Sequence, residues 1–333
     1  MNAPRPRSAA KPPTRPLRRA VHGVLLLDKG LGVSSNAALQ QAKRLFRAEK
    51  AGHTGTLDPL APGLLPLCFG AATKFAQVSL DADKRYLATL RLGATTTTGD
   101  GEGEVVRTRD VSVTRADVET ACARFVGAIR QLPPMHSALK HEGKPLYDYA
   151  RAGVEIEREP RAITIRSIGI VEGESDRWVL DVSCSKGTYV RTLAEDIGEA
   201  LGCGAHLAGL RRTGSGRLDV GAALSIERLE ALSAAEIDAV LLPVDALVAD
   251  WPKIVLTRED AGRFLAGVRR RLALADAPRV RVHGPGGAFL GTGHVAAGEL
   301  IATRLLSPAE VAAASAAPLA PPPRIEESES LLS

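Results

Sequence analysis

The sequence lacks the features that mark membrane proteins and disulfide-bonded proteins. No hydrophobic run approaches the roughly 18 residues that a membrane-spanning helix needs, and the longest, residues 63–72, is interrupted by Pro66. The apolar run at residues 24–27 is too short for the core of a secretion signal. Neither paired nor Cys-x-x-Cys spacing occurs among the cysteines, which are Cys68, Cys122, Cys184 and Cys203. We therefore expect a cytoplasmic protein with reduced thiols and no membrane segment.

Common catalytic signatures are also missing. The seven histidines show no metal-binding spacing, and there is no Gly-x-Ser-x-Gly elbow, Walker loop or well-placed Gly-x-Gly-x-x-Gly. Glu195 and Asp196 form an adjacent acid pair, but neighbours on a helix diverge by about 100°. Such a pair poorly suits a two-carboxylate glycosidase. The sequence thus argues against zinc, serine-hydrolase, nucleotide and glycosidase chemistry.

The chain is basic, but its excess charge is concentrated at one end. The formal net charge is +5, yet residues 1–20 contain six basic residues and no acidic one, while residues 311–333 are net acidic. The rest of the chain is nearly neutral, so the global charge is weak evidence for nucleic-acid binding. Any phosphate-binding face must come from local clusters such as Arg211–Arg212 and Arg269–Arg271.

Composition divides the chain into four parts. Residues 1–20 are rich in Pro and Arg and predict a disordered basic tail. Residues 21–248 alternate strand and helix signals and predict the main domain. In residues 249–310, short apolar segments separated by Gly/Pro turns predict a small, mostly β domain. Residues 311–333 combine an Ala/Pro tract with an acidic end and predict a second disordered tail.

Local patterns in the main domain predict its first elements. A buried strand at residues 24–28 precedes a helix that Ser34 or Ser35 caps. Residues 52–63, with three Gly and two Pro, predict a structured loop. Strands are expected at residues 86–92 and 178–184, and a helix at residues 118–129.

A later helix would place a basic residue at a strand-to-helix junction. Thr192-x-x-Glu195 resembles a capping box, and apolar residues then recur every four positions until Gly202. This pattern predicts that Arg191 lies just before the first turn.

Asp58 is the most informative acid. An Asp before a Pro in a Gly-rich loop usually forms a turn. Its neighbours Leu57 and Leu60 are apolar, so the carboxylate could face a dry surface, where its pKa would rise unless a cation held it ionised. Arg191 could be that cation. Neither observation identifies a function by itself.

Six ordered motifs resemble those of the TruB family of tRNA pseudouridine synthases. The resemblance covers about residues 22–245, with weaker cover to 310, and one departure is Gly30, where the family usually has Pro. The motifs are Asp28-Lys29 with Ser34-Ser35-Asn36; residues 52–63 (GHTGTLDPLAPG); Lys84-Arg85-Tyr86; Gln131-Leu132-Pro133-Pro134 with Ser137-Ala138 and Gly143-Lys144; residues 185–193 (SKGTYVRTL); and residues 202–207 (GCGAHL) with Leu210-Arg211-Arg212.

The resemblance implies a fold and a reaction. The expected fold is α+β: a central, mainly antiparallel sheet flanked by helices, followed by a PUA-like β domain. The expected enzyme is bacterial and isomerises uridine 55 in the T loop of tRNA after the base is flipped out. This reaction is redox-neutral and transfers no phosphate, so we expect no cofactor and no metal.

The resemblance also implies residue roles. Asp58 is expected to be the catalytic carboxylate, and Arg191 to keep it ionised from within about 4–6 Å. Tyr86 would stack under the extruded base and help to move the C5 proton.

Further roles at the substrate follow from the same resemblance. Tyr189 and Leu210 would form walls of the pocket, and His53 would fill the space vacated in the RNA loop. Lys29 is grouped with the substrate-binding residues, although it could be either a charge that acts from behind the residues touching the substrate or simply a loop lysine. Candidate contacts to the RNA backbone are Arg211, Arg212, Arg269, Arg270 and Arg271.

Two alternatives stay open besides the glycosidase. The chain could be a non-catalytic RNA-binding protein that helps tRNA to fold. It could also be a guide-RNA-dependent synthase, which would need protein partners. The main interpretation expects tRNA as partner, no obligatory protein partner and a monomer.

Overall fold

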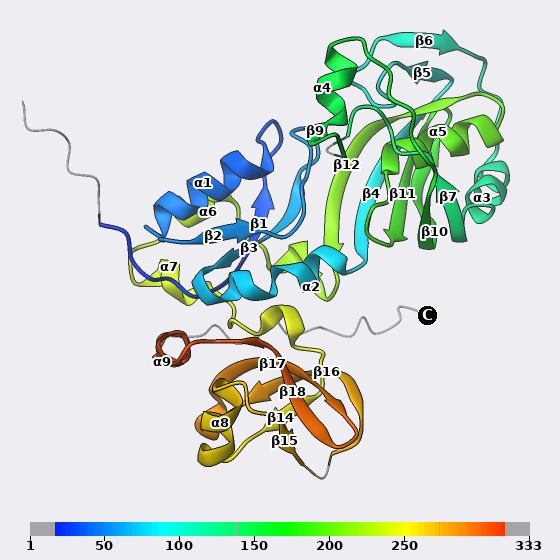
Figure 1. Cartoon of the computed structure of the whole chain (residues 1–333). Helices are drawn as coiled ribbons and strands as arrows, with labels where there is room; N and C mark the ends of the chain where they lie inside the picture. Colours follow the sequence, from blue (N-terminus) through cyan, green and yellow to red (C-terminus); the bar gives the residue numbers. More distant parts are fainter. Residues whose placement is uncertain (1–16, 138, 273, 317–333) are drawn as a thin grey trace, which may run out of the picture.

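The structure is a computed structural model that describes residues 17–316 except 138 and 273 (Figure 1). The predicted tails, except residues 17–20 and 311–316, lie outside the described residues. The described structure begins before residue 21 and continues beyond residue 310, past the boundaries predicted for the two tails. The Arg19 backbone bonds with Arg47 and Glu49 and its side chain pairs with Asp238, and at the other end a helix continues to Ala316.

The main domain is built on one large sheet. Among the described residues it has nine strands, in the order β1-β3-β12-β4-β11-β10-β7, with β2 beside β3 and β13 beside β12. All pairs are antiparallel except β3 and β12, which meet in parallel at Gly63 and Arg212. The expected α+β class and mainly antiparallel sheet are thus confirmed. The strands are β1 Gly23–Lys29, β2 Ala51–His53, β3 Gly63–Phe69, β4 Lys84–Leu92, β7 Gly127–Gln131, β10 Arg161–Glu174, β11 Arg177–Cys184, β12 Ala205–Ser215 and β13 Leu218–Asp219.

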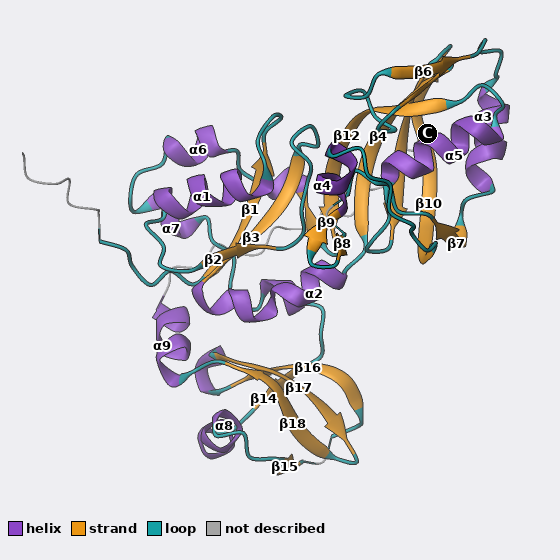
Figure 2. Ribbon diagram, turned by 45° about the horizontal axis from the view of Figure 1, so that its top comes forward, coloured by secondary structure: helices purple, strands orange, loops and turns teal. Residues whose placement is uncertain are grey.

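Helices and two small hairpins surround this sheet (Figure 2). The helices are α1 Ser35–Leu45, α2 Ala76–Asp81, α3 Arg115–Ala123, α4 Leu146–Arg151, α5 Val190–Ala200, α6 Ile226–Glu230 and α7 Glu236–Ala239, with short 3-10 turns at η1 Gly70–Phe75, η2 Val220–Ala222 and η3 Ala246–Val248. The hairpins are β5 Ala94–Thr96 with β6 Val105–Thr108, and β8 Lys140–His141 with β9 Lys144–Pro145.

Two apolar cores meet at the middle of the sheet. In one, α1, α6 and α7 pack against β1 and β3. In the other, α3 and α5 pack against β4 and β11. Tyr86 and Leu210 contact both cores, so they lie where the two halves of the domain join.

The local predictions were partly right. Ser34 caps α1, because its side chain accepts a bond from the Ala37 N–H. The helix expected at residues 118–129 is wrong in its second half: α3 ends at Ala123, and β7 follows as the edge strand that pairs with β10. The capping box at Thr192 is also wrong, because α5 begins at Val190 without a side-chain cap. Arg191 therefore lies inside the first turn.

A separate sheet lies below α2 (Figure 1). Its order is β14-β16-β17-β18-β15, which agrees with the expected β domain, while its helix α8 was not predicted. The elements are β14 Lys253–Val255, α8 Arg258–Leu265, β15 Arg270–Arg271, β16 Ala277–His283, η4 Pro285–Gly287, β17 Phe289–Ala296, β18 Glu299–Leu305 and α9 Pro308–Ala316. Phe289 and Leu306 share an apolar cluster with Val24 and Phe75, which joins this sheet to the main domain.

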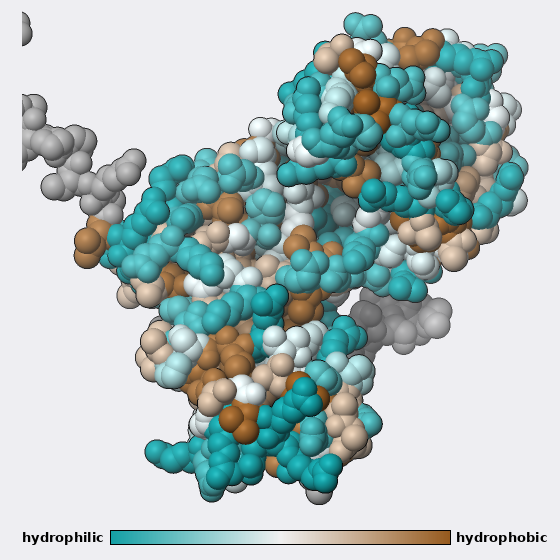
Figure 3. All heavy atoms as spheres, in the orientation of Figure 1, coloured by the Kyte–Doolittle hydropathy of each residue, from teal (hydrophilic) through white to brown (hydrophobic). Residues whose placement is uncertain are grey.

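None of the helices described is long and apolar enough to cross a membrane. Hydrophilic residues cover most of the face seen in Figure 3, with hydrophobic atoms in separate groups. All four cysteines are buried and free.

Candidate active site

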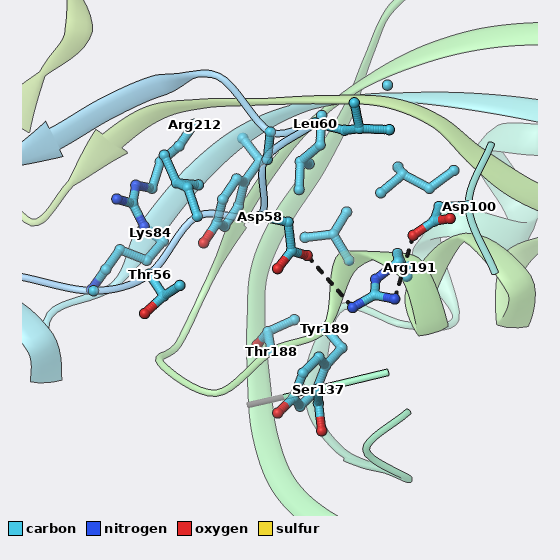
Figure 4. Close-up of a pocket in the computed structure, with 18 of the residues that line it drawn as sticks. Thr56, Asp58, Leu60, Lys84, Asp100, Ser137, Thr188, Tyr189, Arg191 and Arg212 are labelled. Atoms are coloured by element: carbon cyan, nitrogen blue, oxygen red, sulfur yellow. Dashed lines mark ion pairs between the residues drawn. The ribbon is translucent and has the colours of Figure 1, made fainter. Parts of the chain in front are cut away.

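A cleft of about 430 Å³ opens where the two halves of the main domain meet. The loop before β3, strands β4 and β12, the 185–189 loop, and the start of α5 all contribute to its walls (Figure 4). Of the predicted residues, Asp58, Tyr86, Tyr189, Arg191, Leu210 and Arg212 line it. Segments far apart in the sequence are thus brought to one place.

Asp58 and Arg191 form the predicted ion pair. Asp58 Oδ2 lies 3.5 Å from Arg191 Nη2. The Arg191 side chain is 11% exposed, whereas that of Asp58 is 63% exposed. The expected proximity is confirmed, but the dry surroundings expected for Asp58 are wrong, because its loop holds the carboxylate over the open cleft. Any desolvation of Asp58 would have to come from a bound substrate.

Arg191 is fixed by groups that sequence patterns do not connect to it. Its Nη2 donates to the His136 carbonyl oxygen at 2.6 Å, and its Nη1 lies 3.4 Å from Asp100 Oδ2. Asp100 was not among the predicted residues. It lies in a polar turn that pairs with Leu207 of β12, and nothing in its sequence context signals a role. The guanidinium is therefore held between two carboxylates (Figure 4).

The loop that carries Asp58 is fixed by hydrogen bonds to the side chains of Ser35 and Lys29. The Leu57 N–H donates to Ser35 Oγ at 2.8 Å, and Ser35 Oγ donates back to the Leu57 carbonyl. Lys29 Nζ donates to the carbonyl oxygens of Val33 at 2.7 Å and Pro59 at 3.3 Å. The assignment of Lys29 to substrate binding is wrong, because its side chain is only 1% exposed and points into this carbonyl cage. Lys29 fixes the loop instead.

Two tyrosines and a leucine, Tyr86, Tyr189 and Leu210, form part of the cleft wall. Tyr86 comes from β4 and Leu210 from β12. Burial raises the pKa of Tyr86, while the nearby Arg212 guanidinium opposes that rise. The Tyr189 backbone is held at both ends by Gln131, which accepts from its N–H at 2.8 Å and donates to its carbonyl at 3.0 Å.

His53 lies on β2, outside the residues that line the cleft. It is half-buried, and burial lowers its pKa. Its proposed place in the RNA loop stays a prediction.

The predicted phosphate-binding arginines have different surroundings. Arg211 pairs with Asp28 at 2.7 Å and remains 40% exposed, and Arg269 and Arg271 are exposed. Arg270 is engaged with Asp260 at 2.6 Å. Arg212 is wrong as a surface contact: it is 1% exposed and donates from Nε to the Leu64 carbonyl at 2.6 Å. Packing of β12 between β3 and β4 buries it.

No group of three or more His, Cys, Asp or Glu side chains in the described ranges could hold a metal ion.

Family models match residues 43–249 and 252–306 of the chain. A model described as the N-terminal domain of TruB family pseudouridylate synthase matches residues 43–190. A model of the tRNA pseudouridylate synthase B C-terminal domain matches residues 191–249, and one of the C-terminal part of pseudouridine synthase II TruB matches residues 252–306.

Curated relatives agree over nearly their full length. A tRNA pseudouridine synthase B from Burkholderia mallei is 56% identical over 311 residues, which cover 91% of this chain and 97% of the relative. One from Thiobacillus denitrificans is 55% identical over 297 residues, covering 88% of this chain and 98% of the relative.

Solved structures show the same fold at low sequence identity. A chain of a Cbf5-Nop10-Gar1 complex matches with a TM-score of 0.68 and 22% identity, covering 92% of this chain and 94% of its own. A chain of an archaeal box H/ACA Nop10-Cbf5 complex matches with a TM-score of 0.64 and 24% identity, covering 86% of each.

Fold, cleft and family models together define the class, an RNA pseudouridine synthase. The chain belongs to the TruB family, as the motifs in its sequence indicated. It is an enzyme that isomerises uridine to pseudouridine in tRNA.

Proposed function

We propose that the enzyme acts on uridine 55 in the T loop of tRNA with Asp58 as its catalytic carboxylate. The reaction breaks the bond from N1 to C1′, turns the base, and joins C5 to C1′. It needs one carboxylate near the sugar and the base edge, acting as a nucleophile or a base. The observation that carries the proposal is the exposed Asp58 carboxylate held 3.5 Å from a largely buried guanidinium inside the cleft.

The cleft suits a nucleotide that has left its stack. Extruding a base costs a few kcal/mol, and stacking on an aromatic side chain recovers roughly 1–3 kcal/mol. Tyr86 supplies the aromatic ring, and Leu210 and Tyr189 supply further walls. When RNA covers the cleft and excludes water, the attraction between Asp58 and Arg191 becomes stronger.

Arg191 then acts as the group that orients Asp58. Its bonds to the carbonyls of His136 and Thr98 fix the guanidinium before the substrate arrives. A preorganised charge loses little energy to reorganisation during the reaction.

The substrate is recognised mainly by the shape of its loop and by its phosphates. The exposed side chains of Arg211, Arg269 and Arg271 are the basic groups proposed to contact the RNA backbone. Recognition of this kind needs no guide RNA.

We also propose that the enzyme works as a monomer in the cytoplasm without a protein partner. The structures with Nop10 and Gar1 describe assemblies of Cbf5, which is only 22–24% identical to this chain. The test is activity of the purified chain on a bare tRNA transcript, with light scattering to measure its mass. A requirement for an added protein or guide RNA would overturn this part of the proposal.

Tritium release from tRNA containing [5-³H]uridine tests the proposed chemistry. Wild type should release tritium at one uridine, and mass-spectrometric mapping should place pseudouridine at position 55. Asp58→Asn should bind tRNA but release no tritium, because the amide is neither a nucleophile nor a base of comparable strength. Normal release by Asp58→Asn would exclude this residue as the catalytic group.

The same variant tests the alternative of a tRNA-folding protein. A pure binding protein has no need for a carboxylate in a cleft that receives an anionic ligand. If Asp58→Asn still accelerates tRNA refolding, the chain has a folding activity in addition to catalysis.

A further inference from the structure

Among the described residues, four cations line the cleft, and one of them is open to solvent. Lys84 and Arg212 are buried, and Arg191 is largely buried. The Lys186 side chain, by contrast, is 62% exposed. Of these four cations, Lys186 is therefore the one that an anion arriving from outside can reach.

The three enclosed cations are also committed to groups of the protein. Lys84 Nζ donates to three backbone carbonyl oxygens at 2.6 to 3.4 Å. Arg212 Nε donates to the Leu64 carbonyl oxygen at 2.6 Å, and Arg191 lies between two carboxylates. Figure 4 shows Lys84 and Arg212 on one side of the cleft and Arg191 on the other.

Lys186 belongs to a short loop whose base is fixed. The Ser185 N–H donates to the Thr164 carbonyl oxygen at 2.8 Å, and the Thr164 N–H donates to Ser185 Oγ at 2.9 Å. Thr188 Oγ1 donates to the Ser185 carbonyl oxygen at 2.9 Å, and Gly187, with a φ of +80°, lets the chain turn directly after Lys186. A change of partner at Lys186 therefore needs only its side chain to move.

The partner of Lys186 in this structure is an exposed carboxylate. Lys186 Nζ donates to Asp81 Oδ1 at 2.7 Å, and the Asp81 side chain is 46% exposed. Asp81 ends α2 and directly follows Leu80, which lines the cleft. Exposed ion pairs of this kind contribute little to stability, so exchanging Asp81 for another anion costs little.

A substrate nucleotide brings such an anion to the cleft. Asp58 has to reach the sugar of the flipped nucleotide, and a phosphate is attached on each side of that sugar. The exposed acidic side chains that line the cleft, Asp58 and Glu102, repel a phosphate. In the described part of the chain, Lys186 is the exposed cation of the cleft that can offset this repulsion.

We propose that Lys186 binds a phosphate directly next to the flipped uridine, and that Asp81 occupies Lys186 until this phosphate replaces it. The inference rests on the proposed function and adds a phosphate contact at the cleft itself. Lys186 serves binding rather than the chemical step. The contact exists before and during the reaction, so it stabilises the bound substrate and the transition state alike.

Single-turnover rates on a bare tRNA transcript, measured over a range of enzyme concentrations, test the contact. Lys186→Met should raise the half-saturating enzyme concentration by about threefold to thirtyfold and leave the maximal rate within about threefold of wild type. The dependence of the logarithm of this concentration on the logarithm of salt should become shallower by about one. Lys186→Arg should keep the wild-type salt dependence, because it keeps the charge.

Asp81→Asn should have the opposite effect. It keeps the shape of the side chain and removes the anion that competes for Lys186, so the half-saturating concentration at low salt should fall by about twofold to fivefold. The matched control is Arg166→Met. Arg166 pairs with Asp83 at 3.0 Å with similar exposure but does not line the cleft, and its half-saturating concentration should stay within about twofold of wild type.

Altered substrates locate the phosphate. In each of two tRNAs, one phosphate next to uridine 55 is replaced by an uncharged methylphosphonate. With one of these tRNAs, Lys186→Met should cause no further loss of binding, because the partner of the lysine is already gone. With the other, the full loss should remain.

Three outcomes would overturn the inference: an unchanged half-saturating concentration in Lys186→Met, an equal loss in this variant with both altered tRNAs, or an Asp81→Asn variant that binds tRNA no better than wild type. Failure of the proposed function would show differently. It would appear as pseudouridine mapped away from position 55, or as an Asp58→Asn variant that remains active.

Discussion

Arg212, which is buried in the cleft, and Arg270 and Arg281, which are half-buried at the C-terminal sheet, differ in how their charge is neutralised. At the C-terminal sheet, Arg270 pairs with Asp260 at 2.6 Å and Arg281 with Asp245 at 3.3 Å, and both carboxylates are largely buried. In the cleft, Arg212 has no carboxylate partner among the described residues and is held by a backbone carbonyl.

The difference separates arginines that stabilise the fold from arginines that prepare a site. A paired buried charge is satisfied inside the protein, and removing one partner leaves the other uncompensated. An unpaired buried arginine keeps its positive charge and its hydrogen-bond donors available for a ligand that is not yet bound. In the sequence, both kinds are simply arginines in clusters.

Asp58→Asn should show the largest effect, because it removes the exposed carboxylate that faces the cleft, whereas Asp100, the other carboxylate that pairs with Arg191, is only 18% exposed. We expect single-turnover pseudouridine formation to fall at least about a thousandfold, with tRNA binding within a few fold. Rapid-quench tritium release together with filter binding measures both quantities. A loss of binding equal to the loss of rate would show that Asp58 serves recognition.

Arg191→Met should have the next largest effect. It leaves Asp58 and Asp100 facing each other without the cation between them, and removes the donor to the His136 carbonyl. The single-turnover rate should fall by about a hundredfold to a thousandfold. Arg191→Lys should recover only part of it, because one ammonium cannot reach both carboxylates and the carbonyl in the same geometry. Full recovery would mean that charge alone matters at this position.

Arg281→Met and Arg212→Met should differ in stability, which tests the comparison directly. Loss of Arg281 deprives the buried Asp245 carboxylate of a partner and should lower the free energy of unfolding by about 1–3 kcal/mol. Loss of the unpaired Arg212 should change it by less than about 1 kcal/mol, or raise it. Urea unfolding at pH 7 measures both. Equal destabilisation would remove the distinction between the two kinds of arginine.

The smallest effect concerns pH. Burial and the Arg212 charge lower the pKa of Lys84 to about 8, from 10.5 in the unfolded chain. Between these values the unfolded state binds more protons, so this lysine makes stability rise with pH; from pH 8 to 9 the gain is about 1 kcal/mol. Below pH 8 its destabilising effect is fully present.

The matched variant for this prediction is Lys84→Met. Its unfolding free energy, measured by urea titration at several pH values, should lack the rise seen in wild type. An identical slope in the two proteins would show that the carbonyls of Ser79 and Ala82 keep Lys84 charged throughout.

Some features of the fold could be read from sequence because they depend on local patterns. The buried strand β1, the alternating strand β11 and the Ser34 cap of α1 follow from side-chain periodicity and from the capping hydroxyl. Strand β7 could not be read this way. Its pairing with β10 is a contact between distant segments, which overrides the helical pattern of residues 118–129.

The residues of the site also fall into two groups: those that the sequence motifs identified and those whose place only the structure showed. The motifs placed Asp58, Tyr86 and Arg191 together, because a family resemblance carries spatial information that composition lacks. Asp100 was missed because a polar turn with an Asp is common and its neighbour Leu207 lies far away in sequence. Lys29 and Arg212 were misassigned because lysine and arginine usually lie on the surface.

The sequence by itself determined the family, the mixed fold and the residues able to do the chemistry, since these depend on residue types in a fixed order along the chain. Only the tertiary structure decided which charges are exposed and which are enclosed. Exposure depends on how distant strands pack: β3 and β12 meet at one point, bury Arg212 there, and leave Asp58 open above the cleft.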